Sequence, residues 1–154
     1  MFEDTEAKGG FDEIWYLADI VGYGPEPCAC IELLRQYKHI SVAGNRDWAA
    51  IGKIDTSDFN LDAGQAYQWT AQQLTAEDVN YLQALAIELK RDDFTLVHGS
   101  PRQPLWEYLL SVNVARDNFG YFDTNFCLVV HSHVPLTFGQ NKDGKCFVAK
   151  IFVQ

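Results

Sequence analysis

Short hydrophobic segments alternate with helical segments along this chain, and four of the hydrophobic segments end at a polar residue. The four segments are residues 13–18, 39–43, 94–97 and 127–130. Their length and their content of β-branched and aromatic residues predict buried strands. The polar residues that follow them are Asp19, Asn45, His98 and His131. Because alternating strands and helices are typical of a largely parallel sheet, the pattern predicts an α/β fold.

The remaining segments predict how these strands are connected. The spacing of apolar residues predicts helices at residues 25–37, 61–73, 75–86 and 112–118, and short helical turns at residues 48–52 and 106–110. Residues 1–10 are predicted to be the last turns of a helix that two glycines end. Residues 88–90 should pair with residues 94–97, and residues 136–139 with 146–153 around a turn. The 154 residues predict a single domain, 1–154.

Composition excludes several classes of function. The net charge of −9 would repel a nucleic acid duplex or an anionic membrane. No apolar run approaches the ~20 residues of a membrane span, and no basic stretch followed by an apolar run opens the chain. The four cysteines are too sparse for a disulfide scaffold. We therefore expect a cytoplasmic protein with reduced thiols.

The four polar residues should meet at one edge of the sheet, since ligands of open α/β sheets bind outside the carboxyl ends of the strands. One carboxylate, one amide oxygen and imidazole nitrogens suit manganese, iron or zinc better than calcium. His133 lies two residues after His131, and in an extended segment both rings would point to the same side. The residues thus predict a divalent metal centre, with His133 as a further ligand.

Four segments resemble motifs of the calcineurin-like metallophosphoesterases, and their order and spacing resemble that family too. They are residues 17–25, 44–47, 97–101 and 131–135. The chain is most similar to the bacterial branch near the diadenosine tetraphosphatase-like and single-domain phosphodiesterase members. The resemblance implies a sandwich of mostly parallel sheets flanked by helices. It also implies a small phosphorylated substrate and bound divalent ions, with manganese first and iron, zinc or nickel as alternatives.

The chain departs from the pattern of that family at three places. We find no opening strand that ends in Asp-x-His, and we expect the first strand and the last strands of the sandwich to be lacking, because of a natural, start-site or engineered truncation. Arg46 stands where the Gly-Asn-His motif has its histidine. Ala18 and Val130 replace glycines before the aspartate and before the histidine pair. A sheet edge left without its first strand would favour self-association.

Carried over by position, the resemblance implies one complete and one incomplete metal site. The complete site has four ligands, which are Asp19, Asn45, His98 and His131. The other retains only Asp19 and His133. Arg46 replaces the residue that protonates the leaving group, and such a loss usually costs ~10²–10⁴ in rate. Its guanidinium stays charged but can bind a phosphate oxygen, and Asp47 beside it is expected to orient the site or to pair with Arg46.

These features predict metal-dependent hydrolysis of a phosphomonoester or phosphodiester, impaired in this chain. The alternative is a non-catalytic metal-binding or interaction protein with the same fold. Two other readings are weaker: residues 22–27 only approximate a dinucleotide-binding loop, and Cys28 and Cys30 with the two histidines could form a zinc site. Asn45 could also simply cap the helical turn that follows it.

Overall fold

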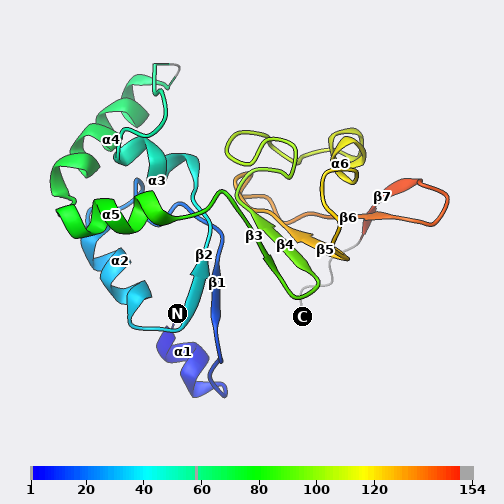
Figure 1. Ribbon diagram of the computed structural model, residues 1–154, viewed down its shortest axis with the longest axis horizontal. Coiled ribbons are helices and arrows are strands. Elements are labelled where there is room, and N and C mark those ends of the chain that lie inside the picture. Colours follow the sequence, from blue (N-terminus) through cyan, green and yellow to red (C-terminus); the bar gives the residue numbers. More distant parts are fainter. Residues whose placement is uncertain (1, 58, 150–154) are drawn as a thin grey trace.

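The computed structural model describes residues 2–57 and 59–149, and its helices and strands alternate as expected (Figure 1). The helices are α1 (Phe2–Ala7), α2 (Pro27–Arg35), α3 (Asn45–Ala50), α4 (Leu61–Gln73), α5 (Ala76–Ala84) and α6 (Val112–Asn118). The strands are β1 (Ile14–Tyr16), β2 (His39–Ser41), β3 (Glu88–Arg91), β4 (Phe94–Val97), β5 (Phe126–Leu128), β6 (Thr137–Gln140) and β7 (Cys146–Ala149).

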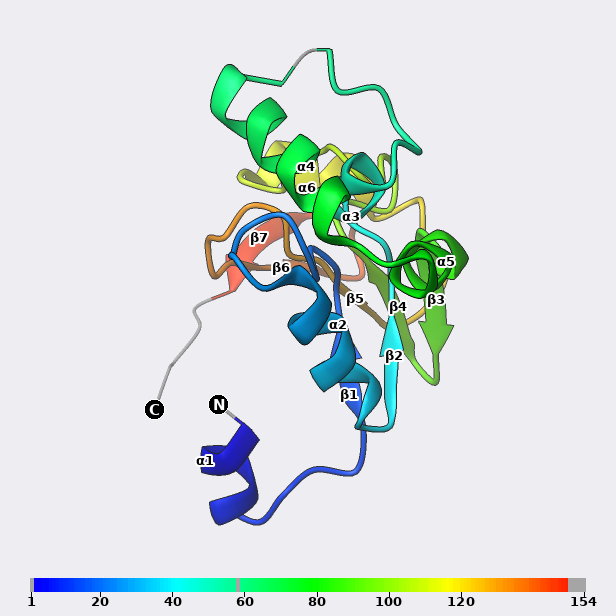
Figure 2. The same ribbon diagram turned by 90° about the vertical axis from the view of Figure 1, so that its left-hand side faces the viewer.

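The strands form three small sheets of mixed direction. β1 pairs with β2 and β4 with β5 in parallel, whereas β3 with β4 and β6 with β7 are antiparallel. The two expected antiparallel pairs, β3–β4 and the closing hairpin, are confirmed. Helices α2 to α5 gather on one side of β1 and β2, and β3–β5, α6 and the hairpin lie on the other side (Figures 1 and 2). The parallel pairs are the ones whose carboxyl ends lead to the polar residues.

The hydrophobic core lies where helices α2, α3 and α5 meet the segment that follows β1. Its buried members are Ile20, Val21, Ile31, Leu34, Ala50 and Leu82. On α2, Ile31 and Leu34 are three residues apart and therefore share one face of the helix. Burying a side chain of this size stabilises the fold by about 1.5–3 kcal/mol. Because Ile20 and Val21 belong to the core, the packing also fixes the position of Asp19, which precedes them.

Side chains define where the longer helices begin. Asn60 accepts from the Ala63 N–H at the start of α4, and Thr75 and Asp78 bind each other's backbone N–H at the start of α5. The predicted cap at Thr75 is confirmed, and such caps are worth about 1 kcal/mol. Helices α4 and α6 have the predicted bounds. Among residues 2–57 and 59–149, the helices are too short or too polar to cross a lipid bilayer.

The helix predicted at residues 106–110 is wrong, because side chains hold this segment in turns instead. The Glu107 carboxylate accepts from Ser100 Oγ at 2.7 Å and from Asn118 Nδ2 at 2.7 Å. Gly99 N–H donates to the Pro104 carbonyl oxygen at 2.6 Å. These bonds fold the segment back toward His98 and α6. Residues 150–153 of the predicted hairpin and Met1 of the predicted first helix lie outside the described residues.

Candidate metal centre

The structure brings together the four polar residues that follow β1, β2, β4 and β5. His98 Nε2 lies 3.0 Å from Asn45 Oδ1, 2.8 Å from His131 Nδ1 and 3.7 Å from Asp19 Oδ1. All four side chains are nearly or fully enclosed: the exposed fraction is 1% for His98 and at most 9% for the others. One carboxylate, one amide and two imidazoles thus share a single buried cluster, which we call the four-donor cluster.

The backbone around this cluster is unusual. Among the described residues, five that are not glycine have a positive φ, and four of them flank or form the site: Ala18 (83°), Asp19 (51°), His131 (40°) and His133 (54°). Backbone in this region costs of order 1–3 kcal/mol per residue and persists only where the surroundings enforce it. The expected extended geometry of residues 131–133 is therefore wrong. β5 ends at Leu128, and Val130 N–H donates to the His98 carbonyl, which turns the chain out of the sheet.

We predict that Ala18→Gly stabilises the protein. Ala18 has a φ of 83°, where an L side chain costs roughly 1–2 kcal/mol and glycine almost nothing. The greater backbone entropy of glycine in the unfolded chain offsets part of this gain. The free energy of unfolding should therefore rise by about 1 kcal/mol, which is about 2–4 °C in Tm. Calorimetry in metal-free buffer measures it. Ala66→Gly, inside α4, is the control and should lower Tm by a similar amount; a lower Tm for Ala18→Gly would contradict the prediction.

The ring of His98 presents a lone pair to the cluster. Its Nδ1 lies 3.2 Å from the Leu17 carbonyl oxygen, and because a carbonyl only accepts, Nδ1 carries the proton and donates it. Burial lowers the pKa of His98, so the ring is neutral and Nε2 is an acceptor. The partner of that Nε2 at 3.0 Å is the amide oxygen of Asn45, which also only accepts. With the Asn45 amide oxygen toward the ring, two acceptors thus face each other without a proton between them.

His131 adds a third acceptor. Burial lowers the pKa of His131 to about 4, and a hydrogen bond with the Trp106 backbone raises it by a smaller amount. The ring is therefore neutral, and its Nδ1 lies 2.8 Å from His98 Nε2. A backbone group that raises the pKa of a histidine is a carbonyl that accepts from it, so we assign the ring proton to the nitrogen on the Trp106 side and the lone pair to Nδ1. Metal-binding histidines have this arrangement, in which one ring nitrogen donates to a backbone carbonyl and the other is left for the ion. Facing acceptors of this kind are stabilised by a cation between them.

The separations in the cluster suit one bound ion. Bonds of about 2.0–2.2 Å from a metal to nitrogen and oxygen ligands place neighbouring ligand atoms roughly 3–3.5 Å apart, and the measured separations run from 2.8 to 3.7 Å. In the described part of the chain, no three His, Cys, Asp or Glu side chains are arranged as a ready-made metal site. Asp19, His98 and His131 are therefore not such a group by themselves, and the centre proposed here rests on the short separations around His98 Nε2 and on the amide oxygen of Asn45 as a fourth donor.

Asp47, in α3, links the start of that helix, where Asn45 lies, to the loop after β1 that carries Asp19. Its carboxylate is fully buried and accepts from the Gly44 N–H at 3.0 Å and from the Val21 N–H at 3.1 Å. Gly44 is therefore the N-cap of α3, because the Asp47 side chain accepts from its N–H. The interpretation of Asn45 as the cap is wrong. Burial raises the pKa of Asp47 to about 7.

Arg46 lies beside Asp19 rather than Asp47. Its backbone N–H donates to Asp19 Oδ1 at 3.2 Å, and its Nε lies 3.8 Å from Asp19 Oδ2. Burial raises the pKa of Asp19, whereas the hydrogen bond and charge of Arg46 lower it. The predicted pairing of Arg46 with Asp47 is not what the structure shows, since both oxygens of Asp47 bind backbone N–H groups.

His133 lies at the rim of the cluster. It is exposed, and its Nε2 lies 3.2 Å from the Tyr23 hydroxyl. A second tyrosine, Tyr108, stacks on the ring of His131 with centroids 4.2 Å apart. Sequence reasoning assigned no role to either tyrosine. Tyr23 falls within the motif at residues 17–25, which could have signalled it, whereas no motif surrounds Tyr108.

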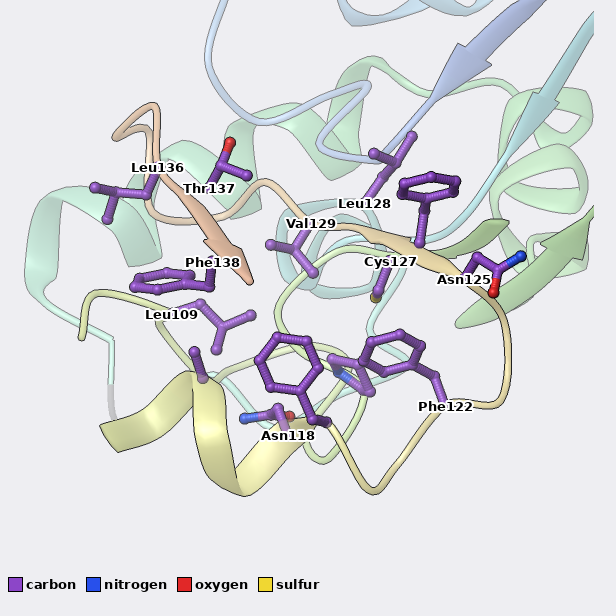
Figure 3. Close-up of a pocket in the computed structure, with 14 residues that line it drawn as sticks. Leu109, Asn118, Phe122, Asn125, Cys127, Leu128, Val129, Leu136, Thr137 and Phe138 are labelled. Carbon is purple, nitrogen blue, oxygen red and sulfur yellow. The ribbon is translucent and has the colours of Figure 1, made fainter. Parts of the chain in front are cut away.

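Two other features lie apart from the four-donor cluster. Cys28 Sγ donates to the Gln73 carbonyl and Cys30 is exposed, so the structure gives no support to a zinc site with the histidines. An apolar pocket of about 270 Å³ lies between α6, β5 and β6, and Leu109, Phe122 and Phe138 are among the residues that line it (Figure 3). None of the four donors lines this pocket.

Comparison with known proteins supports the predicted fold. A metallophosphoesterase from Sphaerobacter thermophilus is 46% identical and matches 92% of this chain with a TM-score of 0.76. A hypothetical protein from Pyrococcus horikoshii is 20% identical and shares the fold alone, over 95% of this chain with a TM-score of 0.75. An uncharacterised protein from Methanocaldococcus jannaschii is 36% identical over an alignment of 131 residues that covers 82% of this chain. No family model matches the chain.

The chain is shorter than these relatives. It spans 53% of the Methanocaldococcus protein, 58% of the Sphaerobacter chain and 66% of the Pyrococcus chain. The predicted α/β fold of the metallophosphoesterase type is confirmed, and the identity of 46% to a metallophosphoesterase supports the resemblance to the calcineurin-like family.

Proposed function

We propose that this chain is a metal-dependent phosphoesterase of the calcineurin-like kind, which hydrolyses a small phosphomonoester or phosphodiester at a reduced rate. The observation that carries the proposal is the set of facing acceptors, since His98 Nε2, His131 Nδ1 and Asn45 Oδ1 meet in a buried space beside a carboxylate. The 46% identity to a metallophosphoesterase supports the choice of reaction.

Four residues would hold one divalent ion, for which manganese is the first candidate: Asp19, Asn45, His98 and His131. A bound ion polarises phosphoryl oxygens and lowers the pKa of a bound water. The Leu17 and Trp106 backbones would keep the imidazoles in the tautomers that ligation needs. Among the described residues, Asp19 and His133 would be the candidates to hold a second ion.

Arg46 would bind the phosphoryl group. Its side chain is 22% exposed, lies beside Asp19 and carries a permanent positive charge. A guanidinium binds phosphate oxygens well, but it does not release a proton near neutral pH. Arg46 would therefore stabilise charge on the substrate without protonating the leaving group, which is our reason for proposing a reduced rate.

The test is hydrolysis of bis(p-nitrophenyl) phosphate by metal-free protein to which Mn²⁺ is added stepwise, together with calorimetric titration of Mn²⁺ binding. We expect Mn²⁺-dependent turnover that a chelator abolishes. His98→Ala should bind Mn²⁺ at least tenfold more weakly, because removing even an outer partner of a metal ligand costs 10–100-fold in affinity or activity.

His39→Ala is the matched control. His39 lies at the start of β2, away from the cluster, where it contacts the Tyr37 carbonyl and the Tyr81 hydroxyl. The variant should therefore keep wild-type Mn²⁺ affinity and turnover. Mn²⁺ binding without hydrolysis would favour the alternative, a non-catalytic metal-binding protein. Neither binding nor hydrolysis in folded wild-type protein would refute the proposed function.

A further inference from the structure

Tyr23 is exposed but is held by two residues of the candidate site. Its exposed fraction is 59%, although its ring covers Arg46 and its hydroxyl meets His133. An exposed side chain gains little from burial, so specific contacts must account for its position. Both contacts are with residues at the rim of the four-donor cluster.

The first contact orients Arg46. The guanidinium carbon lies 3.6 Å from the centroid of the Tyr23 ring, and Nη1 donates to the Gly22 carbonyl at 3.3 Å. The left-handed φ of 96° at Gly22 turns the chain so that Tyr23 returns over Arg46, and a Cβ on Gly22 would lie only 3.0 Å from Arg46 Cβ. The plane of the guanidinium is thereby fixed before any ligand binds.

The second contact anchors the tyrosine itself. The hydroxyl lies 3.2 Å from His133 Nε2, and the two rings meet edge to face with centroids 5.7 Å apart. His133 belongs to the segment after β5, 110 residues away along the chain. His133, in the segment after β5, thus helps to hold the Tyr23 ring over Arg46.

We propose that Tyr23 is a positioning residue that presents the Arg46 guanidinium to a phosphoryl group, with His133 anchoring its hydroxyl. This inference rests on the proposed function. A planar guanidinium held in one orientation loses less side-chain entropy when it binds a phosphate oxygen. Tyr23 then contributes to ligand affinity through Arg46, without touching the ligand.

The experiment measures inorganic phosphate as an inhibitor of bis(p-nitrophenyl) phosphate hydrolysis with Mn²⁺, and phosphate binding by calorimetry. Tyr23→Leu removes the ring and should weaken phosphate binding about two- to fivefold, the worth of an exposed cation–π contact. KM should rise with kcat nearly unchanged. Tyr23→Phe keeps the ring and should lose less affinity than Tyr23→Leu.

The decisive comparison adds Tyr23→Leu to Arg46→Ala. If Tyr23 acts through Arg46, the leucine changes nothing in that background; an equal loss in both backgrounds, or no loss in the wild type, would overturn the inference. Tyr121→Leu, at another exposed tyrosine, should leave phosphate affinity unchanged. Wild-type protein that binds Mn²⁺ but no phosphate would overturn the inference, whereas failure to bind Mn²⁺ at all would refute the proposed function itself.

Discussion

Replacing Asp47 by alanine is expected to lower the free energy of unfolding by roughly 2–6 kcal/mol, because two buried backbone N–H groups lose their acceptor at about 1–3 kcal/mol each. The two groups belong to Gly44, the N-cap of the helix that begins with Asn45, and to Val21, in the loop that carries Asp19. Each kcal/mol corresponds to about 2–4 °C in Tm at this chain length. Thermal unfolding in metal-free buffer measures the loss, and Mn²⁺ affinity should fall with it as the loops separate.

Asp78→Ala is the matched control. Asp78 also accepts from a backbone N–H at a helix start, that of Thr75. Thr75 is exposed, however, and Asp78 is 7% exposed against 0% for Asp47, in a place away from the cluster. Its loss should cost only about 1 kcal/mol and leave Mn²⁺ affinity unchanged. Equal Tm losses in the two variants would contradict a special role for Asp47.

The effect of Asp47→Ala should also depend on pH. Since burial raises the pKa of Asp47 to about 7 from its ordinary value of 3.8, the native state holds a proton that the unfolded chain has released between those two pH values. The stability contributed by Asp47 is therefore full at low pH and falls as pH rises toward 7. The difference in Tm between wild type and Asp47→Ala should be larger at pH 5 than at pH 8.

Replacing Gly44 by alanine should destroy the four-donor cluster by steric overlap. A Cβ on Gly44 would overlap Asp19 Oδ1 and would lie 2.8 Å from the Asp19 nitrogen and 2.9 Å from Ala18 Cβ. The backbone of Gly44 has φ −103° and ψ 171°, which any residue adopts, so the effect is steric. Overpacking of this kind costs about 1–3 kcal/mol, and displacement of Asp19 should abolish measurable Mn²⁺ binding.

Gly64→Ala is the control for this substitution. Gly64 lies in α4 with no heavy atom within 4 Å of an added Cβ, so alanine should stabilise the helix by about 0.5–1 kcal/mol and leave Mn²⁺ binding unchanged. Wild-type Tm and Mn²⁺ affinity in Gly44→Ala would show that the loops separate more easily than the structure implies.

The positions of the four donors were predictable because each depends on a local pattern. The end of each hydrophobic segment predicts which polar residue follows the strand, namely Asp19, Asn45, His98 or His131. Parallel pairing then places the ends of paired strands together. The helices α4 and α6 were predictable for the same reason, since their spacing of apolar residues lies within one segment.

The remaining features depend on contacts between distant residues. The Tyr23 hydroxyl contacts His133, which is 110 residues away in sequence. Glu107, in a segment predicted as a helix, instead accepts hydrogen bonds from Ser100 and Asn118. The positive φ of His131 and His133 follows from where β5 ends and from the bond of Val130 N–H to His98. The pattern of residues within a single segment does not encode these interactions, because their partners lie on other elements.

The four-donor cluster links ion binding to folding of the whole domain. Its donors come from the segments that follow β1, β2, β4 and β5, so the first and the last are separated by most of the chain and meet only when all four strands have assembled. An ion that binds only this assembly stabilises it by mass action, about 2.7 kcal/mol at a free concentration one hundred times its Kd. Such an ion acts as a noncovalent cross-link, and it slows opening of all four loops together rather than of any one alone.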